Sequence, residues 1–417
     1  MVRGVPRPSR RSPHDHLQIA PLRYAEAVDN ESPAGIIGDV LFEHGRKLDA
    51  HGQVDDFWML VRDGVIVETG NGRAPDAGTV VDLEGHWLVP GFIDLHGHGG
   101  GGHSYDDDPD ELLAAIAIHR THGTTRTVVS LVANPVAYLR ASLGMIADLA
   151  AADPLILGSH LEGPFLAPDR RGAHNGAYLI EPDPYLIEEL IGAARGTLRQ
   201  LTIAPELPGA LEAIDVLVES GVVVAIGHTE ATFEQASEAF DRGARLLTHG
   251  FNAMPGIHHR APGPVIAAFE DERVIIELIL DGLHIEPHVA KLAFASAPNR
   301  IALVTDAMAA AGSHDGDYTL GSLTVTVKDG KAVLRGTNTI AGSTLTQDVA
   351  LRNAVTLAGI DPRIAVEALT LTPARVLGLE HRHGLLAPGY VADAVILDHA
   401  WHVTQVFANG QPLELHP

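Results

Sequence analysis

The sequence predicts an α/β protein, because apolar strand-like segments alternate with helix-compatible stretches through most of its length. A doubly wound open sheet is the alternative, but the Gly-x-Gly-x-x-Gly phosphate turn of that fold is missing where it would be expected. Eight alternating units over about 250 residues favour a closed (β/α)8 barrel, the TIM barrel, over the open sheet. The eight predicted strands are residues 89–95, 126–132, 155–161, 199–204, 222–227, 245–249, 274–280 and 301–305.

Both ends of the chain differ from this alternating middle. Residues 37–90 contain short strand-like runs with turn signals, among them Asp63-Gly64 between two apolar runs, which predicts a hairpin. Similar runs return at 392–397 and 402–407. We therefore expect a small β-sandwich domain built from both chain ends. The predicted division is a disordered extension at 1–35, the sandwich domain at 36–88 and 383–417, and the barrel at 89–382 with a β-hairpin insertion near 316–341.

Composition narrows the class of protein further. Hydrophobic residues make up 46% of the 417 residues and charged residues 20%, as in globular proteins. No apolar run reaches the roughly 18 residues that a membrane helix needs. The arginines near the N-terminus precede no apolar stretch, so they do not form a secretory signal. The net charge of −24 argues against non-specific binding of nucleic acid.

Cysteine is absent from the sequence. The chain can therefore form neither a disulfide framework nor a thiolate metal site, which fits a cytoplasmic protein. Any metal ion must be held by histidine, aspartate and glutamate side chains.

The most informative motif follows the first predicted barrel strand. Residues 94–98 read Asp-Leu-His-Gly-His, so His96 and His98 point to the same side, about 7 Å apart along the backbone. Two such imidazoles can bind a transition metal. Glycines at 97 and 99–102 let the backbone turn sharply there. His14 and His16 have the same spacing, but no strand precedes them, and we interpret that pair as exposed to solvent.

Ionisable residues stand at the ends of six of the eight predicted strands. Active sites of barrels lie at the carboxyl ends of the strands, so these residues are expected to share one rim. One buried histidine would be unremarkable, whereas ionisable residues at six of eight strand ends favour a metal centre. The residues concerned are His96 and His98, His160 and Glu162, His228, His249, Asp281 and His284, and Asp306.

Coordination chemistry suggests a role for each group. Glu162, His228 and His249 supply three ligands and leave a fourth position for water, as in catalytic zinc sites. His96, His98 and Asp306 could hold a second ion, with Glu162 bridging the two. Metal binding lowers the pKa of water to about 7. Asp306 is placed to accept the proton that this water releases.

The motifs around these residues resemble those of the amidohydrolase superfamily. Within it, they are similar to the deacetylases that act on N-acetylglucosamine 6-phosphate. The resemblance extends from about residue 58 to residue 412 and leaves 1–35 outside. It implies hydrolysis of the acetamide of N-acetyl-D-glucosamine 6-phosphate to D-glucosamine 6-phosphate and acetate, in amino-sugar catabolism and cell-wall sugar recycling. The motifs are residues 90–98, 161–165, 227–232, 248–255, 304–307, 384–389 and 392–393.

The resemblance also implies roles for single residues. Glu162, His228 and His249 match the primary metal ligands, and Asp306 matches the general acid and base. His174 matches the residue that polarises the acetyl carbonyl, and Arg260 a phosphate-binding arginine donated across a homodimer interface. The implied substrate contacts are Ala173, His174, Asn252, Ala253, Arg260, Asp281 and His284, with Ile340, Ala341 and Gly342 in a loop that covers the sugar.

The implied cofactor is one or two divalent metal ions, with Zn²⁺ favoured and Fe²⁺, Mn²⁺ or Co²⁺ as alternatives. Members of the superfamily differ at the strand-one pair, and here both positions are histidine, which favours two ions. The expected partner is a small phosphorylated amino sugar, with no nucleic acid and no membrane.

Two other functions are open at this point. One is an amidohydrolase that acts on another N-acyl or cyclic amide, such as a dihydropyrimidinase-like enzyme. Arg260 is the residue that distinguishes this function from deacetylation of a phosphorylated sugar. The other is a non-catalytic scaffold, which would be expected to show a gap among the strand-end residues. The sequence shows no such gap.

Overall fold

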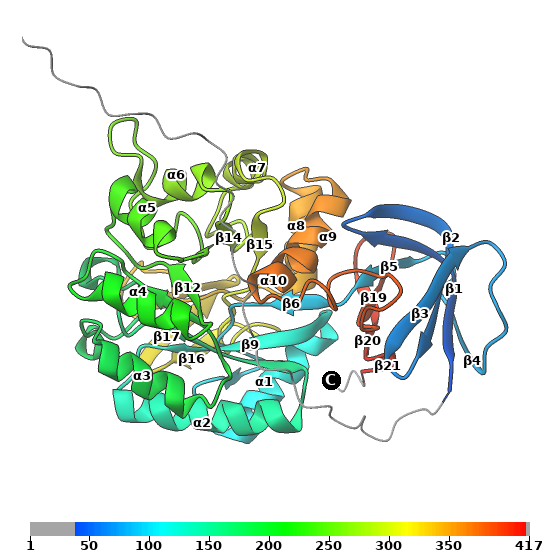
Figure 1. Ribbon diagram of the computed structural model, residues 1–417, viewed down its shortest axis with the longest axis horizontal. Helices are drawn as coiled ribbons and strands as arrows, with labels where there is room; N and C mark the ends of the chain where they lie inside the picture. The colour runs from blue at the N-terminus through cyan, green and yellow to red at the C-terminus, as the bar shows by residue number, and fades with distance from the viewer. Residues whose placement is uncertain (1–37, 414–417) are drawn as a thin grey trace, which may run out of the picture. The chain divides into compact units, whose positions relative to one another are not determined.

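The computed structural model describes residues 38–413, and the predicted extension at 1–35, with His14 and His16, lies outside these residues. The described chain forms a helix-covered barrel and a separate sheet domain (Figure 1). None of the helices within 38–413 is long and apolar enough to cross a membrane.

Eight parallel strands form the barrel, so the predicted fold class is confirmed. They pair in the order β15-β14-β13-β12-β11-β10-β9-β6. Just beyond the strands, the backbone N–H of Asp306 donates to His96 O at 2.8 Å, and that of His98 donates to Ala307 O at 2.7 Å. These bonds join the first and last strand segments at the carboxyl rim. The strands are β6 (Phe92–Asp94), β9 (Thr124–Val132), β10 (Ile156–Glu162), β11 (Leu198–Ile203), β12 (Val223–Ile226), β13 (Leu246–Leu247), β14 (Ile275–Leu278) and β15 (Ile301–Leu303).

Helices connect the strands and cover the outside of the barrel (Figure 1). Several begin at a side chain that accepts backbone N–H groups of the first turn, including Asp108, Asp183 and Asp361. Thr232 and Gln235 form a reciprocal capping box at the start of another. The helices are α1 (Pro109–Thr121), α2 (Val136–Ala152), α3 (Pro184–Ala193), α4 (Ala210–Glu219), α5 (Phe233–Asp241), α6 (Gly263–Glu270), α7 (Pro287–Ser296), α8 (Gln347–Thr356), α9 (Pro362–Leu369) and α10 (Leu371–Val376).

The first predicted strand, 89–95, is in fact parts of two strands. β5 (Trp87–Pro90) belongs to the sheet domain, and β6 starts the barrel at Phe92. Gly91 forms the junction, where a Cβ atom would come within 2.3 Å of Thr125 Oγ1. The apolar run continues through both strands because each is buried, so hydrophobicity alone did not reveal the break.

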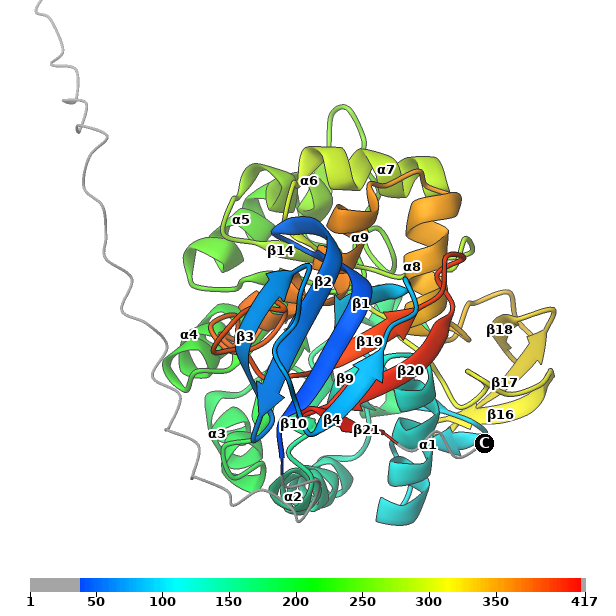
Figure 2. The ribbon, with the colours of Figure 1, turned by 90° about the vertical axis from the view of Figure 1, so that its right-hand side faces the viewer.

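The sheet domain takes strands from both ends of the described chain (Figure 2). The strands of this domain form one hydrogen-bonded sheet, ordered β21-β20-β19-β5-β1-β2-β3, with β4 also paired to β1. Register shifts around Gly45 let β1 pair with β4 before this residue and with β5 after it. Phe42, Met59 and Phe407 share one apolar core between the two parts of the sheet. The other strands of this sheet are β1 (Val40–Asp49), β2 (Gly52–Arg62), β3 (Val65–Asn71), β4 (Thr79–Asp82), β19 (Ala394–Leu397), β20 (Val403–Ala408) and β21 (Gln411–Pro412).

The insertion after β15 has three antiparallel strands rather than the two of a hairpin. β16 (Gly316–Leu320), β17 (Leu323–Lys328) and β18 (Lys331–Leu334) pair in this order. The third strand is a four-residue run, too short to stand out in the sequence. Leu320 and Val325 pack with Met308 at the rim of the barrel, so the insertion lies beside the strand ends.

A buried ionic network joins the amino-terminal side of the barrel to the sheet domain. Arg126, near the start of β9, donates to Asp393 from Nε at 2.7 Å and from Nη2 at 3.1 Å. Its Nη2 also donates to Asn409 Oδ1 at 2.8 Å. His383 Nδ1 lies 3.4 Å from Asp393 Oδ2. We call Arg126, His383, Asp393 and Asn409 the floor cluster.

Candidate active site

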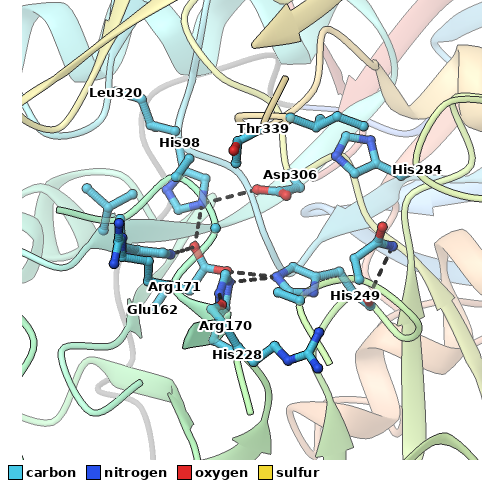
Figure 3. Close-up of a pocket in the computed structure, with 18 of the residues that line it drawn as sticks. His98, Glu162, Arg170, Arg171, His228, His249, His284, Asp306, Leu320 and Thr339 are labelled. Atoms are coloured by element: carbon cyan, nitrogen blue, oxygen red, sulfur yellow. Dashed lines mark hydrogen bonds and ion pairs between the residues drawn. The ribbon is translucent and has the colours of Figure 1, made fainter. Parts of the chain in front are cut away.

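A cavity of about 610 Å³ opens at the carboxyl rim of the barrel, within the usual size range of small-molecule sites. Among the predicted strand-end residues, those that line it are His98, Glu162, His228, His249, His284 and Asp306 (Figure 3). We call His96, His98, Glu162, His228, His249 and Asp306 the rim cluster. The predicted residues that line the cavity are His98, Glu162, Ala173, His174, His228, His249, Asn252, Ala253, His284, Asp306, Ile340 and Gly342.

Glu162, His228 and His249 converge on one point. Glu162 Oε1 lies 3.1 Å from Nε2 of each histidine, and the two Nε2 atoms are 3.0 Å apart. A tetrahedral ion with bonds of about 2.0 Å needs ligand atoms about 3.3 Å apart. The three donor atoms therefore fit one face of a tetrahedral metal site.

Hydrogen bonding assigns the proton of His228. Its Nδ1 lies 2.8 Å from the carbonyl oxygen of Arg170, so Nδ1–H donates and the lone pair on Nε2 points toward Glu162. Gly172 lets the same loop pass close to this ring, since a Cβ there would lie 3.2 Å from His228 Cε1 at a φ of +55°. Nδ1 of His249 has no hydrogen-bond partner among residues 38–413.

A second set of donor atoms lies beside the first. His98 Nε2 is 3.2 Å from both Glu162 Oε2 and Asp306 Oδ1. His96 Nε2 is 3.2 Å from His98 Nε2 and 3.3 Å from Glu162 Oε1. Because Glu162 uses one oxygen toward His228 and the other toward His98, it can bridge two ions. These four residues fit the predicted second metal site.

The ionised carboxylates of the rim cluster favour the binding of positive charge. Burial opposes the charged form of His98, but Asp306 and Glu162 outweigh burial and raise its pKa to about 9. Burial likewise disfavours the charged form of Glu162, but His96 and His174 hold its pKa well below the ordinary value. The carboxylates thus remain ionised and retain protons on neighbouring imidazoles. A divalent ion would replace those protons, which is usual for metal sites of this type.

His174 differs from the candidate ligands in its proton arrangement. Its Nδ1 accepts the backbone N–H of Ala133 at 3.2 Å, which places the proton of the neutral ring on Nε2. That Nε2 lies 3.2 Å from Glu162 Oε2. Burial lowers the pKa of His174 to about 4, so the ring is neutral at pH 7. His174 therefore presents an N–H donor to the cavity, which suits the predicted role at the acetyl carbonyl.

Three residues of the rim cluster have unusual backbone conformations. His228, His249 and Asp306 have φ values of +47°, +28° and +46°. Non-glycine residues rarely adopt this region, and such strain concentrates at functional sites. Each follows the end of a barrel strand, where the chain turns sharply and directs the side chain into the cavity.

The other predicted substrate contacts differ in where they lie relative to the cavity. Ala173, Asn252, Ala253, His284, Ile340 and Gly342 line the cavity. Ala341 does not line it, because this residue is fully buried against the three-stranded insertion. Asp281 is also absent from the lining, since its carboxylate binds His284 Nδ1 at 2.7 Å from behind. Arg260 is exposed, outside the cavity of its own chain, with Nη1 2.7 Å from His259 Nε2.

Some residues around the site were missed by the sequence analysis. Glu277 is fully buried on β14 and contacts His96 through Nδ1. In the sequence Glu277 is a carboxylate inside the apolar run 274–280 rather than at the end of a strand. Arg170 and Arg171 line the cavity. Arg170 ends a short 3₁₀ turn, Pro168–Arg170, and Arg171 follows it directly, in a segment where no periodicity in the sequence indicates which way a side chain points.

Convergent imidazoles and carboxylates at the rim of a (β/α)8 barrel define a metal-dependent hydrolase class. Residues 87–413 match the model of the amidohydrolase family. The chain belongs to the amidohydrolase family, which implies a divalent metal ion.

Several characterised relatives are similar over most of their length. An N-acetylgalactosamine-6-phosphate deacetylase of Escherichia coli O157:H7 is 39% identical, over 88% of this chain and 97% of the relative. An N-acetylglucosamine-6-phosphate deacetylase of Bos taurus is 35% identical, over 79% and 84%.

Solved structures of such deacetylases are also similar to this chain. The N-acetyl-D-glucosamine-6-phosphate deacetylase of Mycobacterium smegmatis, as a D267A mutant in complex with N-acetyl-D-glucosamine-6-phosphate, is 41% identical with a TM-score of 0.86. The match covers 90% of this chain and 99% of that one. The N-acetylglucosamine-6-phosphate deacetylase of Thermotoga maritima is 29% identical with a TM-score of 0.81, over 89% and 99%.

Proposed function

We propose that this protein hydrolyses the acetamide of N-acetyl-D-glucosamine 6-phosphate to D-glucosamine 6-phosphate and acetate. One observation carries the proposal. Glu162, His228 and His249 meet at the base of one cavity, within a chain 41% identical to the Mycobacterium smegmatis deacetylase. The reaction belongs to amino-sugar catabolism and cell-wall sugar recycling, and we place it in the cytoplasm.

The proposed chemistry uses two side chains of the cavity. His174 donates a hydrogen bond from Nε2–H to the acetyl carbonyl oxygen and stabilises the negative charge that develops there. Asp306 accepts a proton from the attacking water and delivers it to the amide nitrogen as the C–N bond breaks. A bound divalent ion supplies a water with a pKa near 7 and polarises the carbonyl.

Zn²⁺ is the metal we propose, held by Glu162, His228 and His249. The donor set contains only nitrogen and oxygen atoms, which Fe²⁺, Mn²⁺ and Co²⁺ also accept. His96, His98, Glu162 and Asp306 are the residues that would hold a second ion.

We propose that the substrate phosphate is bound by Arg260 of the neighbouring subunit in a homodimer. Two observations support this assignment. Arg260 lies outside its own cavity, and it pairs with no carboxylate in the described part of the chain. A planar guanidinium makes paired charge-assisted hydrogen bonds to phosphate. Asp281 is assigned an indirect role, because it holds His284 at the cavity wall.

A second candidate substrate is N-acetylgalactosamine 6-phosphate. The Escherichia coli O157:H7 relative, 39% identical over 97% of its length, is named for that sugar. The two substrates differ only in the configuration of one hydroxyl group, and both carry the same acetamide and phosphate.

The test is an acetate-release assay of the full chain with three sugars at equal concentration. We expect N-acetylglucosamine 6-phosphate to give the highest kcat/KM. N-acetylgalactosamine 6-phosphate and unphosphorylated N-acetylglucosamine are the comparisons. A higher kcat/KM for N-acetylgalactosamine 6-phosphate would identify that sugar as the preferred substrate. Equal rates with phosphorylated and unphosphorylated N-acetylglucosamine would refute the phosphosugar assignment.

A further inference from the structure

Glu277 is a fully buried carboxylate below the cavity, on a strand that is otherwise apolar. Its Oε2 lies 3.1 Å from Nδ1 of His96 and accepts the backbone N–H of His249 at 3.3 Å. Its Oε1 accepts Nε2 of Gln200 at 3.0 Å. No lysine or arginine pairs with Glu277 within residues 38–413, and it does not line the cavity.

A buried carboxylate needs hydrogen-bond donors, because its transfer out of water is costly. The ring of His96 supplies such a donor when its proton is on Nδ1. The lone pair of Nε2 then faces Glu162 Oε1 at 3.3 Å and Asp306 Oδ1 at 3.5 Å. A carboxylate behind a histidine in this way fixes both the proton position and the ring orientation, and raises the basicity of the ligand atom.

The other side chains near His96 do not fix its proton. The ring of His160 packs edge-on against it at 4.7 Å between centroids. However, His160 uses Nδ1 toward Ser130 Oγ at 2.9 Å and Nε2 toward Thr202 Oγ1 at 2.8 Å. His160 therefore restrains the position of the ring, whereas Glu277 determines which nitrogen of His96 is free to bind.

The two histidines of the strand-one pair are supported differently. Nδ1 of His98 has no hydrogen-bond partner in the described chain, while Nδ1 of His96 is held by Glu277. Orientation of the second donor set thus depends mainly on the Glu277–His96 contact. Glu277 contacts the first donor set, Glu162, His228 and His249, through the backbone N–H of His249. The side chain of His249 contacts Glu162 independently of Glu277.

We propose that Glu277 is a positioning residue that enables the centre to hold its second metal ion. The proposal rests on the metal centre of the proposed function. It goes beyond that function by assigning the capacity for two ions to a residue outside both the cavity and the ligand set.

The experiment compares metal binding by the full chain and two variants. Glu277→Gln keeps the size of the side chain and removes its charge. Glu367→Gln is the matched control, because Glu367 is also buried, on α9, where it pairs with Arg375 at 3.0 Å and lies outside the rim cluster. Metal-free protein is titrated with Co²⁺ and Zn²⁺ by calorimetry and visible absorption, and bound metal is counted by elemental analysis.

We expect two ions per chain in the unmodified protein and in the control. In Glu277→Gln the second ion should bind about 10- to 100-fold more weakly, with the first affinity unchanged. Two unchanged affinities in this variant, or only one ion in the unmodified chain, would overturn the inference while leaving the deacetylase proposal intact. An unmodified chain that binds no metal would refute both.

Circular dichroism establishes that each variant is folded. If Glu277→Gln does not fold, Glu277→Asp replaces it, since the shorter side chain keeps the charge and withdraws it from His96. The same weakening of the second ion is then expected, and unchanged affinities contradict the proposal in this variant too.

Discussion

The rim cluster and the floor cluster are both buried and charged, but the positive groups that balance their carboxylates are different. In the floor cluster, the guanidinium of Arg126 neutralises Asp393 with two direct hydrogen bonds. In the rim cluster, every ion-pair partner of Glu162 and Asp306 within residues 38–413 is an imidazole. The floor therefore carries its own cation, while the rim offers lone pairs and negative charge to an external one. In barrels, the amino-terminal face generally serves stability and the carboxyl face catalysis.

The pKa shifts express the same difference. Burial alone would raise the pKa of both aspartates. Arg126 overcomes burial and holds the pKa of Asp393 below its ordinary value. For Asp306, the counter-charges that lower its pKa are those of His96 and His98, which are protons and can be exchanged for metal. A permanent cation fixes structure, and an exchangeable one leaves the site open to chemistry.

Asp306→Asn should produce the largest effect on the rim side of this comparison. Asparagine keeps the size of the side chain but cannot accept the water proton, so kcat should fall by about 10³- to 10⁴-fold. The measurement is acetate release under saturating phosphorylated sugar, with bound metal counted in the same preparation. Asp317→Asn is the control, because Asp317 is exposed on the inserted sheet and pairs with Arg335. A variant that kept more than about a tenth of the activity would remove Asp306 from the mechanism.

Arg126→Met should produce the largest effect on the floor side. The change removes the cation and leaves the buried carboxylate of Asp393 unpaired, which typically costs about 3 to 5 kcal/mol. Denaturant unfolding of the metal-loaded protein measures the loss. The folded variant should retain its metal content and kcat, since Arg126 does not line the cavity.

The control for this variant is Arg140→Met, because Arg140 forms an exposed ion pair with Glu189. Exposed pairs contribute at most about 1 kcal/mol. An equal loss of stability in both variants would mean that the floor cluster has no special structural role.

The sequence predicted the rim better than the floor, for a physical reason. Strand ends in a parallel barrel share one rim, so the spacing of His228 and His249 along the chain sufficed to place them together. Arg126 and Asp393 are 267 residues apart and belong to different parts of the fold, so no periodicity connects them. Glu277 escaped prediction because it lies within a strand, where only the folded barrel reveals the neighbouring imidazole.

Arg260→Ala tests a residue that belongs to neither cluster. If Arg260 binds the substrate phosphate across a dimer, its loss should lower kcat/KM for the phosphorylated sugar by about 10- to 100-fold, as expected for a hydrogen bond between charged groups. Rates with unphosphorylated N-acetylglucosamine should stay the same. Mixing Arg260→Ala with Asp306→Asn chains should restore part of the activity in mixed dimers. If the mixture shows no recovery while each variant is dimeric, Arg260 does not act across the interface.

His383→Gln should produce the smallest effect and refine the account of the floor cluster. Burial lowers the pKa of His383 below its ordinary value, so the folded protein resists protonation of this ring. As the pH falls below about 6.5, the unfolded chain binds the proton first. Stability should then decrease by at most about 1.4 kcal/mol per pH unit until the folded state also becomes protonated.

Denaturant unfolding between pH 7.5 and about 5 should show this slope in the unmodified chain and a shallower one in His383→Gln. His402→Gln is the control, because His402 is exposed and lies outside the floor cluster. Equal slopes in all three proteins would mean that Arg126 and Asp393 alone set the acid response of the floor, and that His383 only fills space beside them.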